Sequence, residues 1–360
     1  MPRVIVVQVV FNNRPWIEPV FSAIFNQTYK DFNVVAVISG NADGSKELIQ
    51  SKFPEAKSRT VDEFLENSDS GTGIEIIDPG YNIGFAKGHN LVFEKYHDAE
   101  FFQLVNPDMI MQPDYIENML KGFEDEKVGA ATGKLYQMEH GTWNMEQLRK
   151  SKTIDTTGVE ISKSGRARDR GQYELDIGQY DASAIVDAVS GAGAMYRHQA
   201  LKAVKILKSG QWSVVSGQKL VTSHLPLDTS FEFFDEDFHS YWEDVDLSWR
   251  MKNKGWKNVF VPSAVGYHGR AAGSSKNGYS DVLGFIKHHR ALPEKIRQLN
   301  YKNHIFMYIK NSPYFYPQFF VREFFMLIYI LLFEISTLKV LPEFLRQLPK
   351  IWKKKKLIYP

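Results

Sequence analysis

The fold class of this chain is indicated first by a run near the N-terminus that reads Val4-Ile5-Val6-Val7-Gln8-Val9-Val10-Phe11. The run is almost continuous in β-branched apolar residues, which is typical of a strand buried on both faces in a parallel sheet. Apolar residues at helical spacing follow over 15–25, and a second apolar run covers 32–38. This order of strand, helix and strand predicts an α/β layered domain with a parallel sheet.

The same alternation continues along the chain. It predicts a helix over 46–52, a strand over 74–77, a helix over 85–96 and a strand over 101–105. Polar loops follow three of the predicted strands, at residues 39–45, 79–84 and 106–108. Because ligands of open α/β sheets bind at the carboxyl ends of the strands, we expect these loops to form one site.

Beyond residue 133 the pattern is less regular. We predict strands and loops that cover the site over 134–185, a loop over 216–240, an acidic helix that begins at Glu243, and a short strand over 259–261. We assign residues 1–300 to one α/β domain. Residues 301–360 then form a helical C-terminal extension rich in aromatic and basic residues.

Composition excludes several classes of function. The 44 Lys and Arg residues nearly balance the 42 Asp and Glu residues, and a net charge of +2 argues against nucleic acid as the main partner. The chain has no cysteine, which excludes disulfides, thiolate zinc sites and cysteine nucleophiles and fits a reducing cytosol. The first apolar run is too short for a signal peptide, so we expect a cytoplasmic location.

The C-terminal segment has the composition of an interfacial membrane anchor. Its charge-free apolar run, residues 324–333, is much shorter than the roughly 20 residues that span a bilayer. Basic residues follow it, ending in the run Lys353-Lys354-Lys355-Lys356. We expect peripheral contact with the inner face of the cell membrane. The alternative is a core helix with a solvated basic tail.

Two residues at strand ends are candidate metal ligands. Asp108 directly follows a predicted strand, and a carboxylate there suits Mg²⁺ or Mn²⁺. His268 follows another strand and supplies an imidazole as a second ligand. Arg270 lies in the small-residue loop 269–275, which suits a loop that closes over a diphosphate. The alternative for Asn106-Pro107-Asp108 is a simple turn.

Glu243 and Asp244 are candidates for a general base, because a carboxylate within hydrogen-bond reach of a hydroxyl can accept its proton. The alternative is that both only favour the first turn of the helix through its dipole. Asp246 is expected to pair with Arg250, four residues later on the same helix.

A series of motifs follows in a fixed order along the chain. They are the first strand, Asn26-Gln27-Thr28-Tyr29, Asp43-Gly44-Ser45, the run from Gly80 to Asn90, Asn106-Pro107-Asp108, Ser190 to Met195, Trp242 to Leu247, and His268. Over roughly residues 3–310 this series resembles the family 2 glycosyltransferases with a GT-A fold, and most of all their bacterial rhamnosyltransferase branch. Each motif alone is weak, but the order and spacing together are highly specific.

The resemblance implies an inverting transferase that uses a nucleotide-sugar donor. Asp108 is then the last residue of the Asp-x-Asp metal motif, His268 completes the metal site, and Asp244 is the catalytic base. It also implies that Asn82, Gly84 and Lys87 lie near the base, ribose or diphosphate of the donor, and that Gly191 lines the sugar cleft.

Two positions depart from the family pattern. Asn106 replaces the first carboxylate of the metal motif, although it stays a candidate donor contact. Ser39 stands where many relatives carry an aspartate that contacts the nucleobase, so Asn41 and Asp43 in the same loop are the candidates for that contact.

The leading hypothesis is transfer of L-rhamnose from dTDP-rhamnose to a bacterial surface glycan or its lipid-linked precursor. Transfer of galactose, galactofuranose or glucose from a UDP-sugar is the variant within the class. A nucleotidyltransferase predicts a glycine- and lysine-rich loop after the first strand, whereas this loop is Asn12-Asn13-Arg14-Pro15. A non-catalytic carbohydrate-binding protein is the third hypothesis. The acceptor, the linkage and the oligomeric state, including a homo-oligomer, stay open.

Overall fold

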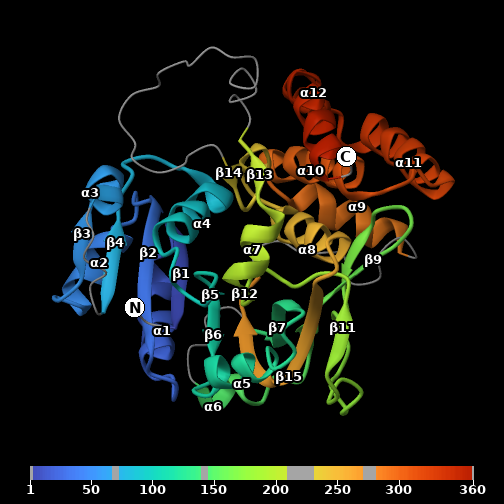
Figure 1. The fold of residues 1–360 in the computed structure, drawn as a ribbon. Coiled ribbons are helices and arrows are strands. Elements are labelled where there is room, and N and C mark those ends of the chain that lie inside the picture. The colour runs from blue at the N-terminus through green and yellow to red at the C-terminus, as the bar shows by residue number, and fades with distance from the viewer. Residues whose placement is uncertain (1–2, 67–72, 139–144, 209–230, 271–280, 359–360) are drawn as a thin grey trace.

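The protein is seen in a computed structural model that describes residues 3–66, 73–138, 145–208, 231–270 and 281–358. A twisted sheet of 11 strands forms the centre, with helices on both faces (Figure 1). The strand order is β11-β15-β7-β12-β5-β1-β2-β4-β3, while β6 pairs with β15 and β8 pairs with β7.

The N-terminal half of the sheet is parallel, as predicted. Its strands are β1 (Val4–Phe11), β2 (Phe32–Gly40), β3 (Lys57–Arg59), β4 (Ile74–Ile77) and β5 (Phe101–Leu104). Side chains of β1 alternate between two cores. Val4 packs in the cluster that contains Ile17 of α1, whereas Ile5 packs with Val92 of α4 on the other face.

The second half of the sheet is mixed. It contains β6 (Met109–Met111), β7 (Val128–Gln137), β8 (Ile154–Thr156), β11 (Ala184–Val186), β12 (Met195–Arg197) and β15 (Lys257–His268). β7 and β15 are parallel to each other, whereas β12 is antiparallel to both β5 and β7. Two small hairpins stand apart, β9 (Val159–Ile161) with β10 (Ala167–Asp169), and β13 (Ile206–Leu207) with β14 (Phe231–Glu232).

Helices cover the sheet and extend from one edge of it. Those before the acidic helix are α1 (Arg14–Phe25), α2 (Ser45–Lys52), α3 (Val61–Glu66), α4 (Gly84–Lys95), α5 (Tyr115–Lys121), α6 (Met145–Leu148), α7 (His198–Val204) and the short η2 (Glu236–Phe238). The others are α8 (Glu243–Asn253), α9 (Val282–Ala291), α10 (Glu294–Asn311), α11 (Pro317–Phe333), η4 (Ile335–Val340) and α12 (Leu341–Ile358).

The predicted fold class is confirmed: a mostly parallel sheet flanked by helices, with a helical C-terminal region. The strand predicted over 259–261 is wrong in length, because β15 runs from Lys257 to His268. Pro262 interrupts its pattern, and the pairing with β7 shifts register between Val261 and Val265. The strands β3, β6 and β7 were not predicted. Most of the loop predicted over 216–240 lies outside the described residues.

The C-terminal helices pack onto the α/β domain. Helix α10 crosses position 300, the predicted domain boundary, and its second half is buried against α8 and α12. Phe306 and Met307 of α10 form a core cluster with Ile351 of α12. Among the described residues no single helix is long and apolar enough to cross a membrane. One pair, α11 with the segment Ile335–Lys356, passes the length and composition test jointly but bends by 114°.

The lysine run near the C-terminus is divided between the core and the surface. Lys354 is fully buried, and its Nζ lies 2.7 Å from Glu232, 2.5 Å from Asp235 and 2.8 Å from Asp237. Lys355 donates hydrogen bonds to two carbonyl oxygens at the C-terminal end of α10. Lys354 is therefore a core residue, and Lys355 is held against the end of α10, so the basic tail of the sequence analysis does not include these two lysines as solvated groups.

Candidate active site

A cavity of about 960 Å³ opens at the carboxyl ends of β1 and β5. The end of β15, the N-terminus of α8 and the β9–β10 hairpin line it too, and α9, α10 and α11 close one side. Nine predicted site residues line it: Asn82, Gly84, Asn106, Asp108, Gly191, Glu243, Asp244, His268 and Arg270. Ser39, the first residue of the third predicted loop, lines the cavity too, so the expectation that the polar loops at strand ends meet at one place holds for all three loops.

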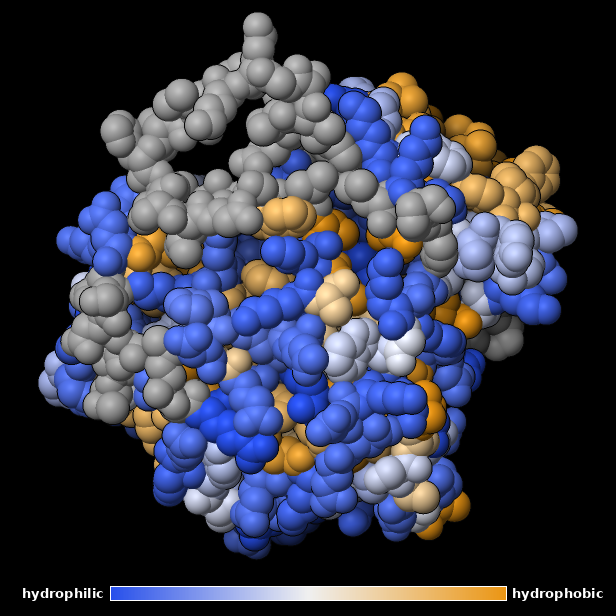
Figure 2. Space-filling view, in the orientation of Figure 1, coloured by the Kyte–Doolittle hydropathy of each residue, from blue (hydrophilic) through white to orange (hydrophobic). Residues whose placement is uncertain are grey.

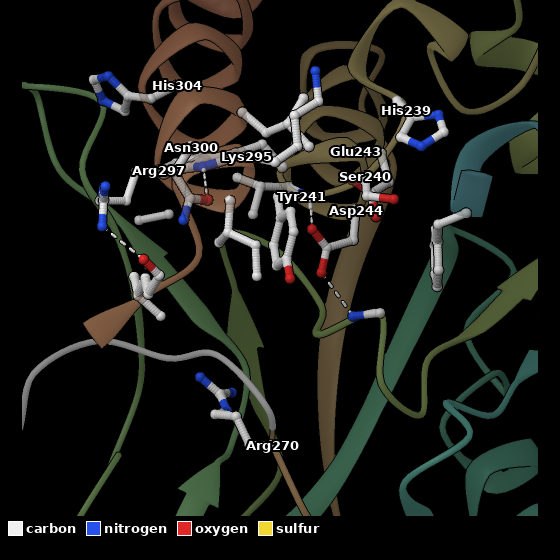
Figure 3. A pocket seen from close by; sticks show the side chains of 18 of the residues that line it. His239, Ser240, Tyr241, Glu243, Asp244, Arg270, Lys295, Arg297, Asn300 and His304 are labelled. Atoms are coloured by element: carbon white, nitrogen blue, oxygen red, sulfur yellow. Dashed lines mark hydrogen bonds between the residues drawn. The ribbon is translucent and has the colours of Figure 1, made fainter. Parts of the chain in front are cut away.

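The carboxylate pair stands at a strained turn before α8. Tyr241 and Trp242 both have positive φ angles, of 71° and 75°, which non-glycine residues rarely adopt. The buried amide of Asn303 on α10 donates to the carbonyl oxygens of Phe238, Ser240 and Tyr241 at 2.9–3.0 Å. Helix α10 therefore fixes the turn that aims the first residues of α8 into the cavity (Figure 3).

Asp244 is the better oriented carboxylate of the pair. Its Oδ2 accepts a hydrogen bond from the Gly191 N–H at 2.8 Å, and its Oδ1 accepts one from the Val245 N–H at 2.8 Å (Figure 3). Burial raises the pKa of Asp244, and the two backbone N–H groups oppose this rise only in part. A Cβ at Gly191 would lie 3.1 Å from Oδ2, so the glycine allows the close approach.

Glu243 is more deeply buried than Asp244. Burial raises its pKa well above the ordinary value, and the neighbouring charge of Asp244 adds to the rise. Its Oε2 has no hydrogen-bond partner among the described residues. Glu243 therefore tends to keep its proton, and Asp244 is the member of the pair that ionises first.

Asp108 and His268 meet because of how β6 pairs with β15. Met109, the residue after Asp108, is the register partner of His268, and the Gly269 N–H donates to the Asp108 carbonyl oxygen at 2.8 Å. His268 Nε2 lies 3.3 Å from Asp108 Oδ1. Its Nδ1 lies 2.9 Å from the buried Oδ2 of Asp155, which fixes the ring orientation.

The charges around His268 show that this place suits a cation. Burial alone would lower the pKa of His268, but Asp108 and Asp155 outweigh it and raise the pKa to about 10. Burial would raise the pKa of Asp108, but His268 and Arg270 outweigh it and the pKa is lowered. No group of three or more His, Cys, Asp or Glu residues forms a metal site within the described ranges. The two predicted metal ligands, Asp108 and His268, therefore lie side by side at the cavity.

Arg270 lines the cavity across from Asp244, but its guanidinium is engaged (Figure 3). Its Nε lies 2.8 Å from Asp155 Oδ1, and its NH1 lies 2.7 Å from Asp169 Oδ2. Arg270 therefore ties the end of β15 to β8 and to the β9–β10 hairpin. The rest of the predicted closing loop, residues 271–275, lies outside the described residues.

The loops after β2 and β4 meet at Ser39. The Ser39 Oγ donates to Asn82 Oδ1 at 2.8 Å and accepts hydrogen bonds from the N–H groups of Ile83 and Gly84. Gly84 has a φ of 79°, and a Cβ there would lie 2.9 Å from the His239 carbonyl oxygen. A glycine is therefore required where this loop touches the turn that precedes α8.

Three residues predicted to contact the nucleotide-sugar donor, Asn41, Asp43 and Lys87, are not among the described residues that line the cavity. Asn41 caps the start of α2 through Lys46 and Glu47, and Asp43 accepts hydrogen bonds from Arg14 and Ser45. Lys87 lies 5.8 Å above the Tyr81 ring and faces a separate depression. Polar residues in a turn serve the turn itself here.

Two supporting residues, Asp155 and Asn303, were not predicted from the sequence. Asp155 lies in a short strand inside a stretch without clear periodicity, and Asn303 lies in the segment assigned to the extension. No local pattern marks either residue, because each acts on a partner more than 60 positions away.

Comparisons with known proteins identify the family. The profile described as "Glycosyl transferase family 2" matches residues 5–204, more than half of the chain. A Haemophilus influenzae protein described as an uncharacterized glycosyltransferase is 26% identical over 137 residues, which are 38% of this chain and 38% of that protein. The chain therefore matches well under two thirds of the length of this curated relative.

Several solved structures resemble the chain at low sequence identity. The mannosyltransferase PcManGT of Pyrobaculum calidifontis, in complex with GDP-Man and Mn²⁺, has a TM-score of 0.45 and 16% identity over 86% of this chain and 63% of its own. GalNAc-T7 with UDP, GalNAc and Mn²⁺ has a TM-score of 0.49 and 10% identity over 86% of this chain and 48% of its own. S. aureus TarS in complex with UDP has a TM-score of 0.44 and 13% identity over 86% of this chain and 81% of its own.

The family profile begins in β1 and ends at the last residue of α7, so it includes the parallel half of the sheet, Asp108 and Gly191. The chain therefore belongs to glycosyl transferase family 2.

Proposed function

We propose that the enzyme is an inverting, metal-dependent transferase that moves a sugar from a nucleotide diphosphate donor to a hydroxyl group. The best candidate is L-rhamnose from dTDP-rhamnose, and the proposed acceptor is a bacterial surface polysaccharide or its lipid-linked precursor. The observation that carries the proposal is that Asp244 and the pair Asp108–His268 face one cavity. We place the enzyme in the cytoplasm, on the inner face of the membrane.

Asp244 is proposed as the general base. The acceptor hydroxyl oxygen attacks the anomeric carbon from the face opposite the leaving group, and its proton passes to Asp244. The bond between the anomeric carbon and the diphosphate oxygen breaks, and its electron pair leaves with the nucleotide. Backbone N–H groups hold both carboxylate oxygens of Asp244, so the base is oriented before the acceptor arrives.

Asp108 and His268 fit a divalent cation. One carboxylate and one imidazole leave positions for the donor diphosphate and water, which is the usual arrangement for Mg²⁺ and Mn²⁺ in nucleotide enzymes. Asp155 holds the far ring nitrogen of His268, so Nε2 faces Asp108. A bound Mg²⁺ or Mn²⁺ would offset the negative charge that develops on the diphosphate.

The donor side of the cavity is proposed to include Asn82, Gly84, Asn106 and Gly191, all of which line it. Transfer of galactose, galactofuranose or glucose from a UDP-sugar is the alternative within the same chemistry. The rhamnose assignment is supported only by the resemblance of the motif series. A non-catalytic carbohydrate-binding role is disfavoured because Asp108, Glu243 and Asp244 are all present at the cavity.

Thermal stabilisation by dTDP, UDP and GDP, each with and without Mn²⁺, tests the donor. A nucleotide at about 100 times its Kd adds about 2.7 kcal/mol to the free energy of unfolding. A metal-dependent shift with dTDP alone supports the rhamnosyl donor, and a shift with UDP instead favours the alternative. No shift with any nucleotide would contradict the proposed function.

Chelation tests the metal. EDTA is expected to abolish both sugar transfer and the metal-dependent part of the nucleotide shift, and added Mn²⁺ or Mg²⁺ is expected to restore them. Asp108→Asn should weaken the metal-dependent shift, whereas Asp187→Asn, a substitution outside the cavity, should leave it unchanged. Transfer that is insensitive to EDTA would contradict the roles of Asp108 and His268.

A further inference from the structure

Helix α11 has two different faces. Arg322, Met326 and Ile330, spaced four residues apart, line the cavity that holds Asp244. The other side of the helix is exposed and apolar, with Phe324, Phe325 and Leu332 exposed by 61%, 63% and 69%. Other large apolar residues exposed on this helix are Phe320, Val321, Leu327, Ile328, Leu331 and Phe333. An exposed apolar face of this extent marks an interaction site.

The apolar surface continues onto the next two elements. Ile335 of η4 is 68% exposed, and Leu341, Leu345 and Trp352 are exposed on α12. Figure 2 shows apolar side chains gathered over α11 and α12, at the upper right of the molecule. We call the exposed apolar residues of α11, η4 and α12 the apolar face.

Charge is distributed unevenly between this region and the rest of the chain. Residues 281–360 contain 14 of the 44 Lys and Arg residues but only 5 of the 42 Asp and Glu residues. Several of these cations are exposed next to the apolar face, among them Lys339 on η4 and Arg346, Lys353 and Lys356 on α12. The only charged residues of α11, Arg322 and Glu323, pair with each other, and both contact the buried His304 of α10.

We propose that the apolar face, with the exposed cations beside it, is a docking surface for an anionic lipid bilayer. This inference deepens the proposed function and rests on it only for the acceptor. It names the surface from which a lipid-linked acceptor would reach Asp244. An apolar helix side bordered by Lys and Arg is the arrangement of interfacial membrane helices, and anionic headgroups attract the cations. A second copy of the chain would bring the same positive charges together, which disfavours a dimer through this face.

The geometry connects the docking surface with the active site. Helix α11 separates the apolar face from the cavity, and a helix with its side chains is about 10–12 Å across. With 17 residues, α11 is about 26 Å long and lies flat more readily than it crosses a hydrocarbon core of about 30 Å. Docking on this side therefore places the cavity wall formed by α9, α10 and α11 close to the headgroups.

Vesicle flotation with the full chain tests the proposal. The probes are vesicles of phosphatidylcholine alone and of phosphatidylcholine mixed with anionic phosphatidylglycerol. The wild type is expected to float with the anionic vesicles, and less so at high salt. The triple variant Phe324→Gln, Leu331→Gln, Leu332→Gln is expected to bind them at least about tenfold more weakly. The double variant Arg346→Gln, Lys356→Gln should lose the preference for anionic vesicles.

A matched control uses apolar residues exposed elsewhere. The variant Leu175→Gln, Ile177→Gln, Ile185→Gln changes three side chains exposed by 61%, 79% and 70% and should float like the wild type. Equal thermal midpoints for all variants establish that each is folded. Binding by the α11 triple variant equal to that of the wild type would overturn the proposal, as would a wild type that binds neither vesicle.

Two further readouts separate this proposal from its alternatives. Sedimentation velocity measures whether the wild type is a dimer. If it is, if the α11 triple variant is a monomer, and if the wild type does not bind vesicles, the apolar face is an interface with a second copy and the proposed bilayer docking is overturned. Nucleotide-dependent thermal stabilisation is measured on the same variants and is expected to be unchanged. If vesicle binding follows the prediction but no nucleotide stabilises any variant, the docking surface stands and the proposed function fails.

Discussion

Two kinds of buried carboxylate lie within one turn of helix α8. Asp246 is fully buried, 3.0 Å from Arg250 and 2.8 Å from Lys310, and it accepts a hydrogen bond from Asn311 at 2.6 Å. Glu243 and Asp244, two or three residues earlier, have no ion pair with any described cation, and the pKa of each is raised by burial. The difference teaches that ion pairing, not burial, separates the carboxylate that holds the core together from the two that line the cavity.

The ion pairs of Asp246 belong to a larger network that extends through the core to the C-terminal helix α12. Lys310 lies 2.5 Å from Asp235, which also pairs with Lys354, so α8, α10, α12 and the segment around η2 share one ion network. Burial would raise the pKa of Asp235, but the two lysines outweigh it and hold the pKa below its usual range. Burial and the charge of Asp235 raise the pKa of Glu232 to about 8 even beside Lys354.

The largest expected effect comes from removing Asp244, the proposed general base. Asp244→Asn should lower the rate of sugar transfer by about 10²- to 10⁴-fold, the usual contribution of a general base. Nucleotide-dependent thermal stabilisation should be unchanged. Asp246→Asn is the matched control on the same helix, and its main effect should fall on the free energy of unfolding. If both substitutions change the rate equally and neither changes stability, the distinction between the two carboxylates is wrong.

The pH dependence of sugar transfer tests the raised pKa of Asp244. Because the pKa of Asp244 is raised, the base is protonated over a wider acidic range than an ordinary aspartate. The value of kcat/KM should therefore fall as pH decreases, with a midpoint above the ordinary aspartate value of about 3.9. An acid limb at or below that value would contradict the raised pKa.

Removal of a central cation from the paired network is the next largest effect. Lys354→Met leaves Glu232, Asp235 and Asp237 without their shared partner, and it should lower the free energy of unfolding by about 3–5 kcal/mol. Urea unfolding measures the loss. Lys356→Met, two positions later and exposed, should change stability by no more than about 0.5 kcal/mol. Equal effects of the two substitutions would show that the buried network does not stabilise the fold.

Asn303 connects the two regions, because it lies on α10 and holds the turn before α8. Asn303→Ala leaves three carbonyl oxygens without this donor, which costs about 1–3 kcal/mol and loosens the strained Tyr241–Trp242 backbone. We expect kcat to fall by roughly tenfold or more while the KM for the donor changes little. Asn303→Asp should retain less activity than Asn303→Gln, because a carboxylate cannot donate to carbonyl oxygens. A change confined to the KM would contradict the positioning role.

The smallest expected effect is a gain in stability. The raised pKa of Glu243 means that its contribution to stability is fully present below its ordinary pKa and is lost as pH rises through its folded pKa. Glu243→Gln should therefore be about 0.5–2 kcal/mol more stable than the wild type at neutral pH, with little difference near pH 4. Urea unfolding at both pH values measures this. A variant less stable than the wild type at neutral pH would contradict an unpaired buried carboxyl.

Sequence patterns located the parts of the site that depend on strand ends. The β-branched run of β1 predicts a central parallel strand, and parallel strands bring their carboxyl ends to one edge, so Asp108 and the loop at Asn82 were expected together. The same reasoning placed Asn41 and Asp43 at the site, although the structure shows their side chains in local turn hydrogen bonds. A loop position alone does not determine which way a short polar side chain turns.

The sequence by itself determined the α/β class, the helix that begins at Glu243, the pairing of Asp246 with Arg250 and the apolar character of α11. These features are periodic or act over a few residues, so the local pattern contains them. Only the tertiary structure decided that Lys354 is a core residue, that Asn303 holds the turn at Tyr241, and that Asp155 orients His268. Each of these contacts joins segments more than 60 positions apart, and the side chains meet only because the sheet and the C-terminal helices pack together.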